Sequence, residues 1–282
     1  MLEIRNLNLK FRKKSILENV SYKFTPGVYC LLGANGEGKT SLMRCMTGIY
    51  NTENVFYNDH LITLSKYASD SISYLPQQFG LYKDLTVKEM LLMLASLKGI
   101  NIKKNPNIVD ECVHLVNLSE KINEKVKSLS GGMIKRLGIA QTLLNDPKVI
   151  ILDEPTAGLD IEERLRFKNI INNIKKDKVI IFSTHIASDV EALCDQVLVM
   201  QNKGIVFSGS IEDIKKRAQG KTYSVIHHEL LEIKTEYEIQ DVYEIESLKH
   251  AKILSTHPLS VGSAKLVSPS IEDGYICLLK NI

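Results

Sequence analysis

The sequence lacks the features that most directly mark secreted, membrane-spanning or nucleic-acid-binding proteins. Its five cysteines are scattered and form no CxxC pair, which favours reduced thiols over a disulfide framework or a zinc site. No apolar run approaches the roughly 18 residues that a spanning helix requires, and the opening MLEIRNLNLKF alternates apolar with polar residues where a signal peptide has an apolar core. The 36 basic and 33 acidic residues leave a net charge of only +3, which gives no indication of nucleic-acid binding.

What is present is the composition of an ordinary globular chain, with 282 residues, 44% hydrophobic and 24% charged. Short strand patterns alternate with helical ones, which predicts a mostly parallel sheet. LEIRNLNLKF and SILENVSYKF predict an antiparallel pair at a sheet edge, whereas VYCLLG, KVIILDEP and KVIIFSTH predict buried strands. We therefore expect an intracellular α/β protein.

Helical spacing dominates from about residue 81 to 145, which predicts a run of helices there. A strand hairpin, DQVLVM and GIVFSG, and a capped helix, SIEDIKKRAQG, follow the last buried strand. After Gly220 the pattern changes to strand-like KTYSVIHH, YEIQDVYEI and HAKILST, with a final capped helix in SPSIEDGYICLLK. These changes predict a main domain over residues 1–218 and a small α+β domain over residues 219–282.

The segment GANGEGKT, from Gly33 to Thr40, fits the pattern GxxxxGK[ST]. Glycines let backbone N–H groups curl around phosphate oxygens, and the helix that follows adds the positive end of its dipole. Lys39 is then placed to reach the outer phosphates, and the Thr40 hydroxyl to ligate Mg²⁺. The alternative is a glycine-rich turn with a solvated lysine, but the position between a buried strand and a helix favours a phosphate loop.

The strand VIIL ends in two acids, Asp153 and Glu154. Ligands bind at the carboxyl edge of open α/β sheets, so Asp153 suits a Mg²⁺ role and Glu154 could accept a proton from an attacking water. An acid pair at the turn before Pro155 is the alternative. Gln77 follows a predicted strand where it could sense Mg²⁺ or water, and His185 follows another where it could contact a γ-phosphate, although such residues are more often plain surface residues.

Six motifs in a fixed order, GANGEGKT, YLPQ, LSGGM, VIILDE, GLD and STH, resemble the ATP-binding subunits of ABC transporters over roughly residues 1–218. The flanking segments, such as LGIAQTLLNDPKVIILDEPTAGLD, are similar to bacterial ABC-2-type subunits, which often serve efflux of peptides, antibiotics or cell-surface components. The end of the chain resembles the C-terminal extension of such subunits less specifically. The resemblance implies a P-loop NTPase core with a mostly parallel sheet, an antiparallel edge subdomain and an inserted helical subdomain.

The same resemblance assigns roles by position. It implies that the triphosphate of ATP is held by Gly33, Asn35, Gly36, Gly38, Lys39, Thr40 and Ser41. It assigns Mg²⁺ to Thr40, Gln77 and Asp153. Glu154 becomes the general base and His185 the γ-phosphate contact, and Gln77 is counted with them as a catalytic residue. Asp160 lies at a subunit interface. Phe11 stands where the family has a tyrosine that stacks on adenine, and a core role at the edge strand is equally open for it.

The fifth position of LSGGM is Met133, where the family most often has glutamine. Ser130, Gly131 and Gly132 remain, so contact with phosphate should survive while any contact from a glutamine side chain is lost. The chain has one phosphate loop and one LSGG, and the LSGG has no lysine. We therefore expect residues 130–132 to cover the γ-phosphate held by the loop of a second subunit, so that ATP drives dimerisation.

Competing functions fit less well. Ribosome-acting relatives have two ATP-binding domains per chain, and residues 81–127 are too few for the coiled coil of DNA-repair relatives. A phosphate-loop GTPase is disfavoured because NKG at residues 202–204 lacks the aspartate of the guanine-reading NKxD pattern. A binding module without catalytic activity is disfavoured because Glu154 stands beside Asp153.

The resemblance therefore implies an ATP-hydrolysing subunit that drives a separate transmembrane permease, in the direction of export. It implies a second ATP-binding subunit, identical or not, and a position at the cytoplasmic face of the membrane. The permease is expected to dock near residues 77–92, and no nucleic acid is expected. A non-transport ABC ATPase acting on a soluble assembly is the alternative.

Overall fold

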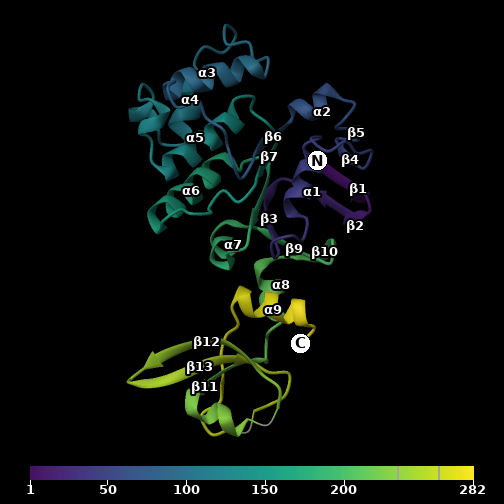
Figure 1. The fold of residues 1–282 in the computed structure, drawn as a ribbon, viewed down its shortest axis with the longest axis vertical. Helices are drawn as coiled ribbons and strands as arrows, with labels where there is room; N and C mark the ends of the chain where they lie inside the picture. The colour runs from purple at the N-terminus through teal and green to yellow at the C-terminus, as the bar shows by residue number, and fades with distance from the viewer. Residues whose placement is uncertain (234, 260) are drawn as a thin grey trace. The chain divides into compact units, whose positions relative to one another are not determined.

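The computed structural model describes residues 1–233, 235–259 and 261–282. The chain, drawn as a ribbon in Figure 1, divides into two compact units, Met1–Val206 and Phe207–Ile282. Each unit has a hydrophobic cluster of its own. The boundary that the sequence placed at residue 218 lies inside the second unit. The difference arises because helix α8 (Ile211–Lys216) packs against helix α9 (Ile271–Lys280), a tertiary contact that no local pattern reveals.

The first unit is built on a six-stranded sheet in the order β10-β9-β3-β8-β7-β6. Its strands are β3 (Gly27–Leu32), β6 (Ile72–Leu75), β7 (Val149–Leu152), β8 (Val179–Thr184), β9 (Gln196–Gln201) and β10 (Gly204–Gly209). The strands from β6 to β9 run parallel. Every residue of β7 and β8 is buried, in agreement with their continuous apolar sequences. The predicted buried strands are thereby confirmed.

A second sheet of the first unit is antiparallel, in the order β2-β1-β4-β5. It consists of β1 (Leu2–Phe11), β2 (Lys14–Phe24), β4 (Val55–Tyr57) and β5 (His60–Leu61). The predicted antiparallel pair is confirmed as β1 and β2. Helix α1 (Lys39–Met46) lies in the same hydrophobic cluster as both sheets, since Leu2, Leu31 and Met43 belong to it and are fully buried.

The segment predicted to be helical contains α3 (Val87–Leu97), α4 (Ile108–Leu115) and α5 (Gly131–Leu143), with short 3-10 turns at Ser119–Lys121 and Val126–Ser128. Figure 1 shows these three helices gathered on the β6 side of the large sheet, away from β1 and β2. The remaining helices of the first unit are α2 (Lys66–Asp70), α6 (Ile161–Ile174) and α7 (Ala187–Leu193). No helix in the part of the chain that is described is long and apolar enough to cross a membrane.

The second unit has a four-stranded antiparallel sheet in the order β12-β13-β11-β14. Its elements are β11 (Thr222–Ile226), a 3-10 helix at His227–Glu232, β12 (Glu238–Ile245), β13 (Leu248–Leu254) and β14 (Lys265–Leu266), besides α8 and α9. Ser210 with Asp213 and Ser270 with Asp273 form the two capping boxes that start these helices. A Cβ at Gly274 would lie only 2.0 Å from the carbonyl oxygen of Ile214, so the approach of α9 to α8 requires glycine there.

Candidate active site

The loop between β3 and α1 has a backbone conformation that depends on glycine. Gly36 and Gly38 have φ angles of 92° and 96°, a region that residues with a Cβ rarely adopt. A Cβ at Gly38 would lie 2.8 Å from Cδ2 of Leu17, and one at Gly33 would lie 2.7 Å from the carbonyl oxygen of Met200. Gly38 is the N-cap of α1 and has no side chain to occupy the first N–H groups of the helix, which therefore face the loop and are suited to an anion.

Lys39 points back into this loop. It is only 6% exposed, and its ammonium donates hydrogen bonds to the carbonyl oxygens of Gly33 (2.7 Å) and Ala34 (3.0 Å). Burial lowers the pKa of Lys39, while the negative charges of Glu154 and Asp153 act in the opposite direction. Because both bonded partners are neutral, the positive charge of the ammonium is available to an anion in the loop.

A cleft of about 390 Å³ opens at the loop. It is lined by Ile16, Asn35, Gly36, Gly38, Lys39, Thr40, Ser41, Gln77 and Glu154. All of these except Ile16 are residues that the sequence analysis selected. They meet because β3, β6 and β7 are parallel, so that the segments following these strands emerge at one edge of the sheet.

Asp153, the residue before Glu154, is buried, with 2% of its surface exposed. The Ser183 hydroxyl donates to its Oδ1 (2.7 Å), and the Tyr74 hydroxyl donates to its Oδ2 (3.3 Å). Burial, reinforced by the charge of Asp153, raises the pKa of Tyr74 to about 12, so the phenol keeps its proton and remains a donor. With both oxygens hydrogen-bonded, the carboxylate has a fixed orientation.

Glu154 is held by contacts from several elements. The Gln77 amide donates to its Oε2 (2.9 Å), and Nδ1 of His185 lies 3.7 Å from its Oε1. The backbone of Glu154 has a φ of 47°, and its N–H donates to the Ser183 hydroxyl (2.9 Å). The structure thus brings together Gln77, Glu154 and His185, three of the residues that the sequence analysis selected, and one buried serine connects Glu154 to Asp153.

The donor atoms suit a magnesium ion. Mg²⁺ prefers oxygen ligands and is usually held by one or two carboxylates together with waters and substrate phosphates. Thr40 and Gln77 line the cleft, and the buried Asp153 carboxylate is connected to Glu154, which also lines it, through the Ser183 hydroxyl. This set fits the ion that the sequence analysis assigned to these residues.

Residues 130–132 lie elsewhere, at the start of α5, and none of them lines the cleft of its own chain. Ser130 caps α5 by accepting a hydrogen bond from the Met133 N–H (3.3 Å). A Cβ at Gly132 would lie 2.6 Å from the Glu163 side chain. Asp160 caps α6 by accepting from the N–H of the same Glu163 (2.8 Å). Gly132 and Asp160 therefore both contact Glu163, which does not line the cleft.

Phe11 ends β1 with 44% of its surface exposed, and it does not line the cleft. Its ring meets that of Tyr50 edge-on, with 5.1 Å between the ring centres. The Tyr50 hydroxyl accepts a hydrogen bond from Arg44 (2.9 Å). Of the two roles that the sequence left open for Phe11, the exposure does not favour the core.

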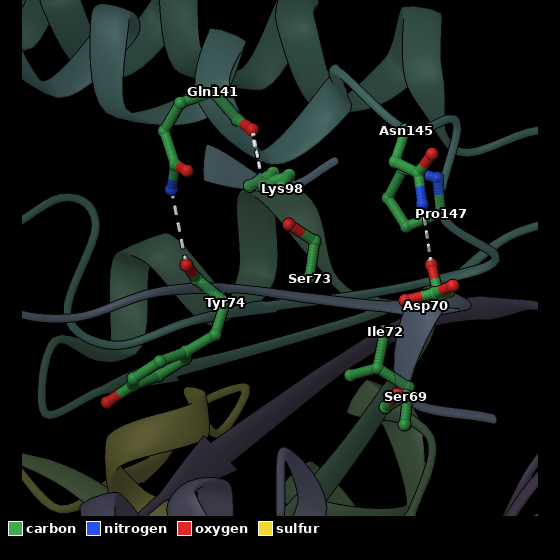
Figure 2. A pocket seen from close by; sticks show the side chains of 9 residues that line it. All are labelled: Ser69, Asp70, Ile72, Ser73, Tyr74, Lys98, Gln141, Asn145 and Pro147. Carbon is green, nitrogen blue, oxygen red and sulfur yellow. Dashed lines mark hydrogen bonds between the residues drawn. The ribbon is translucent and has the colours of Figure 1, made fainter. Parts of the chain in front are cut away.

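A second pocket of about 240 Å³ lies along β6, the edge strand of the large sheet (Figure 2). The Lys98 ammonium donates to the carbonyl oxygen of Gln141 (2.6 Å), and the Gln141 amide donates to the carbonyl oxygen of Tyr74 (3.2 Å). Burial lowers the pKa of Lys98 to about 8. The Tyr74 ring points away from these groups in Figure 2, and its hydroxyl reaches Asp153. Tyr74 thus lies between this pocket and the acids.

Sequence reasoning missed the residues that act by holding others. Ser183 is the serine of the STH motif, in a predicted buried strand and one residue before the end of β8, and that position is the signal that could have identified it. Tyr74 and the ion pair of Arg136 with Glu163 depend on contacts between segments far apart in the chain, and no local pattern marks them.

Comparisons with known proteins agree with this geometry. The family model described as ABC transporter matches residues 17–157. The chain is 33% identical over 233 residues to the uncharacterized ABC transporter ATP-binding protein YxlF of Bacillus subtilis (strain 168). The alignment covers 82% of this chain and 78% of the relative. It is 30% identical over 234 residues to the Nod factor export ATP-binding protein I of Burkholderia lata, with 81% and 73% covered.

A solved structure is also similar. That of cbiO1 from Clostridium perfringens, part of the ABC transporter complex cbiONQ, aligns with a TM-score of 0.68 at 25% identity, over 76% of this chain and 89% of that one. The family model, the relatives and the fold agree with one another. The chain therefore belongs to the ABC transporter family as one of its ATP-binding proteins, which bind and hydrolyse ATP.

Proposed function

We propose that this chain is the ATP-hydrolysing subunit of an exporter, and that two such subunits close around two ATP molecules to drive a separate transmembrane permease. The observation that supports the proposal is the division of the site within one chain. The cleft at residues 33–41 offers a phosphate loop and the carboxylate of Glu154, while residues 130–132 present a second glycine turn that does not line this cleft. Both features are explained if the cleft of one chain and residues 130–132 of a second chain together form one complete ATP site.

In the proposed reaction, water attacks the γ-phosphorus of ATP in line with the leaving oxygen of ADP. Glu154 accepts the proton, and its carboxylate is kept in place by Gln77 and by the backbone bond to Ser183. Lys39 neutralises charge on the outer phosphates, and His185 approaches the γ-phosphate from the end of β8. When bound, Mg²⁺ would neutralise the charge that develops on the phosphate oxygens.

In this proposal, residues 130–132 of the second subunit cover the γ-phosphate of the ATP bound in the cleft. Ser130, Gly131 and Gly132 begin a helix of thirteen residues, and the N-terminus of such a helix favours an anion through its free N–H groups and its dipole. Ser130 and Gly131 are exposed, as a surface that meets a partner must be. ATP held by one loop and covered by the other chain's residues 130–132 would join the two subunits.

The permease and the direction of transport are inferred from relatives. One relative is named for Nod factor export, and another protein of the same fold is part of a transporter complex. The expected position at the cytoplasmic face of the membrane follows from that partner. Whether the second ATP-binding subunit is a copy of this chain is decided by what co-purifies with the tagged chain from membranes.

The proposal is tested with Glu154→Gln, which keeps the shape of the side chain and removes the base. We expect the variant to retain ATP binding, to lose turnover by about 10²- to 10⁴-fold, and to form a dimer with Mg²⁺ and ATP in sedimentation velocity. Glu53→Gln, an exposed residue outside the cleft, is the matched control and should behave as the wild type. Hydrolysis at the normal rate by Glu154→Gln would remove the general-base assignment.

A further inference from the structure

A single ion pair with little solvent exposure joins the helix that starts at residues 130–132 to the helix that starts after Asp160. Arg136 on α5 donates from Nε to Oε2 of Glu163 (3.1 Å) and from Nη2 to Oε1 (3.3 Å). Their side chains are only 4% and 14% exposed. Two parallel hydrogen bonds fix the orientation of the guanidinium relative to the carboxylate, whereas a single bond would allow rotation.

Glu163 also contacts both exposed turns. Its backbone N–H donates to Oδ1 of Asp160 (2.8 Å), so Asp160 is held as the cap of α6. Its side chain packs so closely against Gly132 that a Cβ there would lie 2.6 Å from three of its atoms. One residue therefore touches the glycine turn on one side and the capping aspartate on the other.

Arg136 connects the same junction to α4. Its Nη1 donates to the carbonyl oxygens of Val116 (3.1 Å) and Asn117 (2.6 Å), which follow the last turn of α4. All three guanidinium nitrogens are thus hydrogen-bonded. A second cation, Arg166, donates to Oε1 of Glu163 (3.0 Å) from one turn along α6. The junction is a network in which the carboxylate of Glu163 is the shared acceptor.

We propose that Glu163 is a positioning residue that holds residues 130–132 and Asp160 as one rigid face, so that both reach the nucleotide of a second subunit together. The inference rests on the proposed function, because this face acts on a second molecule. Glu163 does not line the cleft of its own chain. It therefore acts on the neighbour's nucleotide through Gly132 and Asp160, and not on the ATP held by its own loop.

This role predicts a split between two measurements. Glu163→Gln keeps the size of the side chain, but it replaces one acceptor oxygen with an NH₂ group that faces the donors of Arg136. The paired orientation of α5 and α6 is then lost, while the loop around Lys39 and its contacts are untouched. Binding of ATP by a single subunit should persist, and closure of two subunits around ATP should weaken.

The experiment places Glu163→Gln in the Glu154→Gln chain and measures ATP affinity by fluorescent-nucleotide titration and dimer affinity by sedimentation. The control is Glu162→Gln, the neighbouring residue, which is 73% exposed and paired with Arg166. We expect Glu163→Gln to leave the ATP affinity of the single subunit within about twofold and to weaken the dimer about tenfold, within the range of coupling residues remote from a ligand. Glu162→Gln should change neither.

Unchanged dimer affinity in folded Glu163→Gln overturns the inference, and so does an equal loss of ATP affinity, which would mark a general structural role. If circular dichroism shows that this variant does not fold, Arg136→Lys replaces it under the same readouts, because lysine keeps the charge but not the paired bonds. A parent Glu154→Gln chain that stays monomeric with ATP overturns the proposed dimer and this inference with it. A parent that dimerises while both junction variants dimerise equally well overturns this inference alone.

Discussion

The buried hydroxyl of Ser183 offers a sharp test of how the acids are held. It donates to Asp153 and accepts from the N–H of Glu154, with distances of 2.7 and 2.9 Å, and it has no exposed surface. Ser183→Ala removes both bonds without adding bulk. The buried carboxylate loses a donor, and a backbone N–H at an unusual φ of 47° loses its acceptor.

The size of the effect follows from these two losses. A hydrogen bond to a charged group contributes about 1.5–3 kcal/mol, and a buried N–H left without a partner costs about 1–3 kcal/mol. Because water can enter from the cleft and replace part of this, we expect a net destabilisation of about 3 kcal/mol. For a domain of this size, that lowers the thermal midpoint by about 6–12 °C.

Turnover should fall as well, because even a small displacement of the Glu154 carboxylate from the attacking water lowers the rate of hydrolysis. The strained backbone of Glu154 relaxes once its N–H is free, and we expect the kcat for ATP to fall by about tenfold or more. Scanning calorimetry and a steady-state phosphate-release assay measure the two effects. Ser208→Ala, on the exposed side of β10 in the same sheet, is the control. A midpoint within about 2 °C of the wild type, with unchanged kcat, would refute the reasoning.

Two further predictions concern the loop and the second pocket. Gly38→Ala forces a Cβ into the left-handed region and within 2.8 Å of Leu17, so we expect ATP affinity to fall about tenfold; Gly80→Ala, with open space around it, should leave the affinity measured by nucleotide titration unchanged. Folding lowers the pKa of Lys98 from 10.5 to about 8. Between these pH values the unfolded chain therefore binds more protons than the folded one, and the free energy of unfolding of the wild type should increase as the pH rises. Thermal midpoints from pH 8 to 10.5 should therefore rise in the wild type relative to Lys98→Met, and parallel curves would contradict the buried ammonium.

Much of the fold was predictable because local signals agreed with it. The apolar runs VIIL and VIIFST predicted the two fully buried strands β7 and β8, and Ser210 with Asp213 predicted the start of α8. The phosphate loop was predictable because its glycines, Lys39 and the flanking elements are contiguous in the sequence. Such features depend on residues within one turn or one strand of each other.

The features that the sequence did not reveal depend on long-range packing. The close contact of Gly274 with Ile214 places α8 with the second unit, although the pattern of α8 itself gives no sign of it. The partners of Asp153 come from β6 and β8, and only the register of the parallel strands brings them to it. The junction at Glu163 forms between separate helices, so in the sequence Arg136, Glu163 and Arg166 look like ordinary surface residues of amphipathic helices.

Whether one subunit completes the ATP site of another is tested most directly by crosslinking two differently tagged chains, one with Asn35→Cys and one with Met133→Cys. Both contain Glu154→Gln to retain ATP, and the five native cysteines are buried, while Asn35 is exposed and Met133 partly so. Met133→Cys leaves residues 130–132 intact. With a short thiol-reactive crosslinker, Mg²⁺ and ATP, we expect a product that contains both tags, which should be absent without ATP. No mixed product with ATP, or an equal yield without it, would contradict a site shared between two subunits.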